Sequence, residues 1–150
     1  MNNDIQVAAA YDYGIKHQYA EKNTEYEVTI SGNITLIRSN VLYNEEDMGK
    51  NYYEKILEIS QWGETGLTNI YLGNCTKLRK IASPSENSFI NITNFIQTFL
   101  NCESLTEIPE DLFSNCPNVD SFQSAFENCI GLTSLPQNLF SNCQQVTDSG

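Results

Sequence analysis

The second half of the chain repeats its pattern of apolar and polar residues every 27 positions. Residues 95–121 and residues 122–148 are identical at 13 of 27 positions when they are aligned without gaps. Each unit divides into two similar halves, because an Asn-Cys pair recurs at about half of the full period. Repeats of about 20 to 50 residues are typical of stacked arrays, so this period predicts a solenoid. The five pairs are Asn74-Cys75, Asn101-Cys102, Asn115-Cys116, Asn128-Cys129 and Asn142-Cys143.

Apolar residues keep fixed distances from each cysteine, with one three positions before it and another three positions after it. Columns of this kind allow identical side chains to stack between successive turns of the chain. We expect the residue before each cysteine to sit on a tight helical turn, and the stretch after it to be a strand about 4.8 Å from its neighbour. The residues before are Leu72, Phe99, Phe113, Phe126 and Phe140, and those after are Leu78, Leu105, Val119, Leu132 and Val146.

Turn-forming residues punctuate each unit. Asparagine tolerates left-handed backbone angles, so the residue in front of each cysteine predicts a sharp turn. Proline ends a strand, and Pro109 and Pro136 each follow an apolar residue at the expected strand end. Residues 82–89 depart from the pattern, because they read ASPSENSF with Ser88 in the cysteine column. We expect a looser loop there.

Residues 1–65 follow the pattern weakly. Residues 26–36 alternate apolar and polar side chains around a Ser-Gly-Asn turn, which is typical of strands. Residues 44–59 begin with Asn44 as a possible N-cap and space their apolar residues as a short helix does. We therefore expect an N-terminal arm or extension over residues 1–25, a divergent capping turn with a short helix over residues 26–65, and repeats with an uncapped end over residues 66–150.

The charge of the chain is negative and unevenly distributed. The net charge is −11, and all eight Lys and Arg residues lie at or before Lys80. Residues 81–150 include eight acidic side chains. Because nucleic-acid phosphates and anionic membranes attract clustered Lys and Arg, the composition disfavours both as partners. The N-terminus carries Asp4 and only a short apolar run at Val7–Ala10, so we expect no signal peptide and no membrane insertion.

Candidate catalytic and metal-binding residues are sparse. His17 is the only histidine and lies outside the repeats, so we expect no catalytic residue and no enzyme activity. The steps between cysteines lack the short spacing of zinc sites, which favours five buried thiols without disulfides. Glu107, Glu110 and Asp111 could coordinate calcium, but a solvated acidic edge is the preferred interpretation. No metal or cofactor is predicted.

The motif F-x-x-x-F-x-N-C-x-x-L-T-x-I-P-x-x-L-F-S-N-C-x-x-V-x-S-F of residues 95–122 resembles the BspA-like leucine-rich repeats of bacterial surface proteins. The likeness covers residues 26–148 and is strong over residues 66–146. It implies a right-handed leucine-rich-repeat solenoid, an α/β repeat of short strands and short helical turns with a divergent β-rich N-terminal turn. Members of the family are adhesins or surface proteins that bind host proteins, and related arrays are similar to segments of phage fibres.

The sequence therefore predicts a non-enzymatic protein-recognition module of the adhesin or receptor-binding type, located at the cell surface or outside the cell. The alternative is a structural phage virion component, such as a fibre, tail or capsid-associated protein. The expected partner is a host or bacterial surface protein, or another virion protein. Copies could also associate, because Lys77, Arg79 and Lys80 adjoin the acidic repeats. The candidate binding residues are Thr106, Glu107, Thr133, Ser134, Ser85 and Glu86.

Overall fold

The computed structural model describes residues 4–6, 29–31, 34–38, 56–64 and 66–147. Within these residues the regular secondary structure consists of six very short strands. The strands are β1 Asp4–Gln6, β2 Thr29–Ser31, β3 Leu36–Arg38, β4 Glu58–Ile59, β5 Asn69–Tyr71 and β6 Lys80–Ile81. They form three separate two-stranded parallel sheets, which pair β1 with β2, β3 with β5, and β4 with β6.

The predicted fold class, a right-handed α/β leucine-rich-repeat solenoid, is wrong. The described residues contain no helix, and their strands form only these three short sheets. From residue 82 to residue 147 the backbone is a succession of turns, with one isolated parallel bridge between Asn94 and Ser121. The reason is local, because hydrogen bonds between residues i and i+3 close one turn after another. No segment is left that is long enough to propagate a helix.

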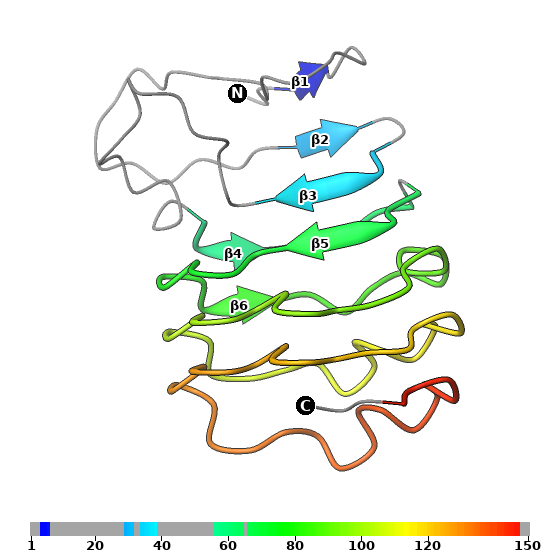
Figure 1. The fold of residues 1–150 in the computed structure, drawn as a ribbon. Coiled ribbons are helices and arrows are strands. Elements are labelled where there is room, and N and C mark those ends of the chain that lie inside the picture. Colours follow the sequence, from blue (N-terminus) through cyan, green and yellow to red (C-terminus); the bar gives the residue numbers. More distant parts are fainter. Residues whose placement is uncertain (1–3, 7–28, 32–33, 39–55, 65, 148–150) are drawn as a thin grey trace, which may run out of the picture.

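The repeated units nevertheless lie against one another. We refer to residues 95–121 as the interior unit and to residues 122–147 as the end unit, and Figure 1 shows them following one another down the molecule. Backbone N–H groups of the interior unit donate to C=O groups of the end unit and of the residue just before it. Four such bonds, with N···O distances of 2.8 to 2.9 Å, run from Phe95, Gln97, Phe99 and Asn101 to Ser121, Gln123, Ala125 and Glu127.

The core consists of apolar side chains stacked from unit to unit. The rings of Phe95 and Phe122 lie 5.5 Å apart and 7° from parallel, and those of Phe99 and Phe126 have the same separation and angle. The predicted stacking of equivalent side chains is therefore confirmed for these two pairs. Full burial of one such ring contributes about 1.5 to 3 kcal/mol. The largest fully buried side chains are Phe89, Phe95, Phe99, Phe113, Leu67, Ile70, Leu72, Leu78, Ile92, Leu105, Leu112 and Val119.

The first half of each unit turns at a left-handed asparagine. Asn101 has a φ of 58°, and the Cys102 N–H donates to the Phe99 C=O over 3.1 Å. A positive φ at the third residue of a four-residue turn is the geometry of a type II turn, which favours Gly or Asn at that position. Asn74 and Asn128 also have positive φ values, of 65° and 59°. The turn predicted in front of the cysteine is confirmed at these three positions.

The second half of each unit turns differently. Asn115 and Asn142 are not among the described residues with positive φ. Here a turn opens at a proline, because the Pro109 C=O accepts the N–H of Leu112 over 3.1 Å and Pro136 does the same one unit later. Proline has no backbone N–H to donate but keeps its C=O, so it can occupy the first position of a turn, where only the carbonyl is used. The Asn-Cys pair therefore occurs in two backbone conformations, one with a positive φ at asparagine and one without.

Residues 82–89, where the sequence pattern breaks, end in two buried side chains. Phe89 is buried, and its ring centroid lies 5.0 Å from that of Trp62. Ser88 is buried as well, and its hydroxyl accepts the N–H of Ser85 over 3.0 Å. The residues before them, Ser83 and Ser85 to Asn87, are exposed, and the looser loop expected there stays a prediction. Phe89, one position after the cysteine column, supplies the aromatic side chain that the pattern lacks.

The predicted N-terminal features fall only partly within the described residues. Of the predicted arm over residues 1–25, the structure describes strand β1 alone, and β1 pairs with β2. The predicted helix over residues 44–59 lies outside the described residues as far as residue 55, and its last two residues form strand β4. Strand β4 pairs with β6, and β3 pairs with β5. The last two pairings join residues 36–38 and 58–59 to residues 69–71 and 80–81, which precede the interior unit.

Candidate functional site

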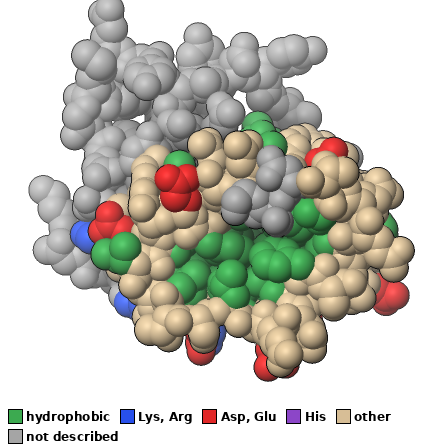
Figure 2. Space-filling view, turned by 60° about the horizontal axis from the view of Figure 1, so that its bottom comes forward, with side chains coloured by type: hydrophobic (Ala, Val, Ile, Leu, Met, Phe, Trp, Pro, Cys, Tyr) green, Lys and Arg blue, Asp and Glu red, His purple; other side chains and the backbone are tan. Residues whose placement is uncertain are grey.

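The end unit exposes apolar side chains whose counterparts in the interior unit are buried. Leu135 is 44 % exposed and Phe140 is 39 % exposed, whereas Ile108 and Phe113, which occupy the equivalent positions of the interior unit, are 6 % and 0 % exposed. Figure 2 views this end of the molecule and shows hydrophobic side chains gathered at its centre, inside a rim of polar side chains and backbone. Apolar side chains grouped in this way mark a candidate contact surface for a partner.

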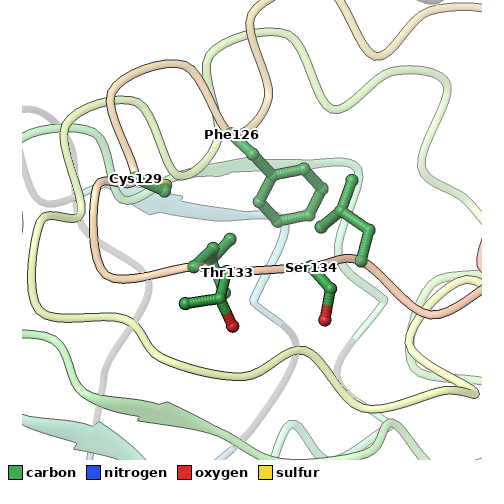
Figure 3. Close-up of a pocket in the computed structure, with 6 residues that line it drawn as sticks. Phe126, Cys129, Thr133 and Ser134 are labelled. Atoms are coloured by element: carbon green, nitrogen blue, oxygen red, sulfur yellow. The ribbon is translucent and has the colours of Figure 1, made fainter.

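An open hollow of about 230 Å³ lies on the end unit. Figure 3 shows the Phe126 ring on one side of the hollow, with Thr133 and Ser134 on the segment opposite. The two hydroxyl groups can donate and accept hydrogen bonds, while the ring offers an apolar face. The hollow is shallow and open, so it offers a partner an apolar surface with two hydroxyl groups beside it rather than an enclosed pocket. Its lining residues are Phe126, Cys129, Leu132, Thr133, Ser134 and Leu135.

The structure places the six predicted binding residues in three locations. Thr133 and Ser134 line the hollow together. Thr106 and Glu107 occupy the equivalent positions of the interior unit and are exposed. Ser85 and Glu86 belong to the segment where the sequence pattern breaks, and the Ser85 hydroxyl lies 2.8 Å from the hydroxyl of Ser88, so Ser85 is engaged in its own turn. Only the first of these pairs lies beside exposed apolar side chains.

The sequence reasoning missed the apolar part of this surface. It assigned Phe126, Leu132 and Phe140 to core columns, and the structure leaves Phe126 and Leu132 partly buried and Phe140 exposed. The sequence carries no signal for this difference, since the equivalent side chains of the earlier units are buried. Leu135, which follows the candidate residue Ser134, belongs to the same group.

The cysteines are buried free thiols, and their burial was predicted. Three of them donate to a backbone carbonyl of the preceding unit. The Cys129 thiol, for example, donates to the Phe99 C=O over 3.0 Å. That carbonyl also accepts the Cys102 N–H, so both of its lone pairs are used. Cysteine therefore acts here as a small core residue that links units.

Burial keeps these thiols protonated. Desolvation raises the pKa of the Cys116 thiol from 9.0 to about 12. Desolvation also raises the pKa of Cys102, Cys129 and Cys143 above 9.0. The nucleophile and metal ligand is the thiolate rather than the thiol. At neutral pH these four groups are therefore poor nucleophiles and poor metal ligands.

The three acidic residues weighed as calcium ligands lie on the surface. Glu107, Glu110 and Asp111 are all exposed, and Asp111 accepts a hydrogen bond from the hydroxyl of Ser83 over 2.6 Å. Among the described residues, no group of three or more His, Cys, Asp and Glu side chains is arranged to hold a metal ion. Arg79, one of the three clustered cations, forms an ion pair with Glu58 over 2.9 Å. This exposed pair joins β4 to the chain beside β6.

The described residues also contain no helix with the length and apolar character needed to cross a membrane. Comparison with known proteins gives no relative to set beside this geometry, because no family model, curated protein or solved structure matches the chain. The likeness to BspA-like repeats therefore depends on the motif letters of the sequence. Function has to be argued from the end unit itself.

Proposed function

We propose that this protein is a non-enzymatic protein-recognition module of the adhesin or receptor-binding type. The observation that carries the proposal is the apolar end, where Leu135 and Phe140 are exposed although their counterparts are buried in the core. Protein interfaces commonly have such an apolar centre, and aromatic residues supply much of their binding energy. The polar rim around the patch agrees with this anatomy (Figure 2).

The groups beside the patch suggest the kind of partner. Thr133 and Ser134 place two hydroxyls at the hollow, where they can orient a partner through hydrogen bonds. No Lys or Arg follows Lys80 in the sequence, so the charged side chains of residues 81–150 are all acidic. A partner with a neutral or basic surface therefore meets no charge repulsion, whereas an acidic partner does.

The thiol chemistry supports a recognition role rather than catalysis. Catalytic cysteines need a lowered pKa and access to substrate. Here burial raises the pKa of Cys129 and Cys143, the two cysteines of the end unit, and both thiols donate to backbone carbonyls. Cys129 lines the hollow, so it contributes shape and apolar surface to the site in its protonated form.

The test is a binding measurement on purified components. The immobilised 150-residue chain is used to isolate proteins from bacterial and host-cell surface extracts. Each recovered protein is then purified and titrated against the chain. The double variant Leu135→Ser, Phe140→Ser should bind at least tenfold more weakly. Ile90→Ser is the matched control, because Ile90 is 38 % exposed but lies outside the end unit. It should change the affinity by less than twofold.

Two results would contradict the proposal. One is that no purified surface protein binds the chain in direct titration. The other is that a partner binds the double variant as tightly as the unaltered chain, which would place recognition elsewhere on the molecule. Circular dichroism of the variants provides the folding control, since both replaced side chains are already exposed and the fold should survive their loss.

A further inference from the structure

Neighbouring units are joined by the same contacts each time. The side-chain amide of Asn101 donates to Asn74 Oδ1 over 2.7 Å, and the amide of Asn128 donates to Asn101 Oδ1 over 2.9 Å. The Cys102 thiol donates to the Leu72 C=O, and the Cys129 thiol donates to the Phe99 C=O. A Phe-x-Asn-Cys tetrapeptide is therefore the element that attaches the end unit to the unit before it.

The attachment of Phe126–Cys129 to Phe99–Cys102 shows what this tetrapeptide contributes. Its ring stacks on the Phe99 ring with centroids 5.5 Å apart, and its thiol reaches the Phe99 carbonyl. The backbone takes part as well, because the Phe99 N–H donates to Ala125 and the Asn101 N–H donates to Glu127. The joint thus combines a ring stack, two side-chain hydrogen bonds and two backbone hydrogen bonds.

The end unit presents the same groups outward. Within the part of the chain that the structure describes, the N–H groups of Phe126 and Asn128 have no acceptor, and Asn128 Oδ1 has no donor. The Phe126 C=O accepts the Cys129 N–H over 3.1 Å, which leaves one of its two lone pairs free to accept another hydrogen bond. The corresponding carbonyl, that of Phe99, uses its second lone pair to accept the Cys129 thiol. The hollow beside the Phe126 ring completes the set (Figure 3).

We propose that the end unit binds a Phe-x-Asn-Cys segment of another polypeptide, lying parallel to Phe126–Cys129. The proposal rests on the protein-recognition function above and names its site and the chemistry of its partner. The bound phenylalanine stacks on Phe126, the bound asparagine donates to Asn128 Oδ1, and the bound thiol donates to the Phe126 carbonyl. Carbonyl groups of the segment accept the N–H groups of Phe126 and Asn128. Each contact repeats one that already joins units within the chain.

The donor pattern argues against the simplest alternative, a symmetric dimer of two end units. In a two-fold contact centred on Phe126 and Asn128, the same groups meet from both sides. The N–H row at Phe126 and Asn128 would then face a second N–H row, and neither row could pair. An incoming segment that offers carbonyl groups satisfies the row, as in recognition by addition of an extended peptide to an open backbone edge.

The direct test uses a labelled peptide with the sequence of residues 95–121 and the full chain. Fluorescence anisotropy under reducing conditions should show saturable binding. Peptides with Phe99→Ser, Asn101→Ala or Cys102→Ala should each bind at least fivefold more weakly, because each removes one contact. A scrambled peptide of the same composition should not bind.

The matching protein variant is Asn128→Gly, which retains the backbone freedom needed at a φ of 59° and removes the acceptor Oδ1. It should bind the peptide at least fivefold more weakly. Ser124→Gly is the control, because Ser124 has a similar φ of 53° and its hydroxyl is not among the proposed contacts. Its affinity should stay within twofold of the unaltered chain. Peptide binding should also slow amide hydrogen exchange at Phe126 and Asn128.

The outcomes separate this proposal from the proposed function. Absence of peptide binding, or equal binding to the Asn128→Gly variant and the unaltered chain, overturns the Phe-x-Asn-Cys proposal. If the peptide fails while a purified surface protein still requires Leu135 and Phe140, the recognition function stands with a different partner chemistry. If the peptide binds as expected and slows exchange at the two amides, the chemistry of the site is established even without a natural partner.

Discussion

The interior unit and the end unit have closely similar sequences and different surroundings. They share the stretch Leu-Phe-Ser-Asn-Cys, yet Phe113 is fully buried while Phe140 is 39 % exposed. Phe113 has aromatic neighbours in both units, including Phe95 at 4.6 Å and Phe140 at 5.7 Å. Burial in this fold is therefore decided by the units on either side rather than by the local sequence. The same five-residue stretch therefore places its phenylalanine in the core in the interior unit and on a candidate binding surface in the end unit.

The largest expected difference between the two units concerns this pair of phenylalanines. Phe113→Ala should lower the free energy of unfolding by about 3 to 5 kcal/mol, because it leaves a cavity among packed rings. Phe140→Ala should cost about 1 kcal/mol, since much of that ring is already in contact with solvent. Urea unfolding followed by fluorescence of the single tryptophan measures both. Equal losses for the two variants would mean that the end unit is packed as firmly as the interior unit.

The contact between the two units can be tested at a glycine. A Cβ atom added at Gly131 would lie 2.6 Å from the Leu105 carbonyl oxygen and 2.8 Å from that of Glu103. Both are backbone atoms of the interior unit, so the end unit has to shift to accommodate a methyl group. Gly131→Ala should therefore lower the free energy of unfolding by about 1 to 3 kcal/mol.

Gly73→Ala is the control for this substitution, because its added Cβ would lie 3.2 Å from the nearest atom, the Gln97 carbonyl oxygen. The neighbour has to move less there, and the loss measured by urea unfolding should be clearly smaller than for Gly131→Ala. The order of the two losses is the decisive quantity. A Gly131→Ala variant as stable as the unaltered chain would show that the two units are not in this close contact.

The two halves of the interior unit should also respond differently at their asparagines. Asn101 has a positive φ and makes amide hydrogen bonds with Asn74 and Asn128. Asn101→Ala should lower the free energy of unfolding by about 1 to 2 kcal/mol, because alanine is strained in the left-handed region and removes the amide. Asn101→Gly relieves the strain and should recover part of the loss. Thermal unfolding monitored by circular dichroism measures these differences.

Asn115→Ala supplies the comparison, since Asn115 is exposed and is not among the residues with positive φ. Its free energy of unfolding should stay within about 0.5 kcal/mol of the unaltered chain. If Asn115→Ala were as costly as Asn101→Ala, the two halves of the unit would share one turn geometry, contrary to the structure.

The repeat itself could be predicted from the sequence, and so could the burial of its cysteines and the stacking of Phe99 on Phe126. These features follow from spacing, which the sequence displays directly. The fold class could not be predicted in this way, because spacing indicates which side chains stack and not which backbone conformation connects them. The strands and helical turns expected around each cysteine are consecutive turns over residues 82–147. Phe89 was also missed as the aromatic of the broken unit, since it stands one position outside its expected column.

The candidate site was predicted in part. Thr133 and Ser134 were identified as exposed residues of the repeat, and they line the hollow. Phe126 and Leu135 were not identified, because in the earlier units their columns are buried. Only the structure shows that Leu135 is exposed and Phe126 partly buried. A residue pattern describes what a unit can bury and does not state whether a neighbour is present to bury it.

The smallest expected effect is the pH dependence of the buried thiols. The Cys116 thiol keeps its proton to about pH 12 in the folded chain because burial raises its pKa, whereas an ordinary thiol loses its proton near its pKa of 9.0. Between these values the folded state binds more protons than the unfolded state, so stability falls as the pH rises. The contribution is fully present below pH 9, and about 1 kcal/mol of it should be lost by pH 10.

Urea unfolding at several pH values between 8 and 10 measures this loss, and the Cys116→Ala variant should lack it. Cys143 is the counterpart in the end unit, and burial raises its pKa as well. Cys143 is 7 % exposed and Cys116 is 1 % exposed, so the Cys143 thiol is desolvated less. Cys143→Ala should therefore change the pH dependence of the stability less than Cys116→Ala does. An equal change for both variants would mean that the end unit excludes water as completely as the interior unit. The two units would then not differ in exposure, and the proposed binding surface depends on that difference.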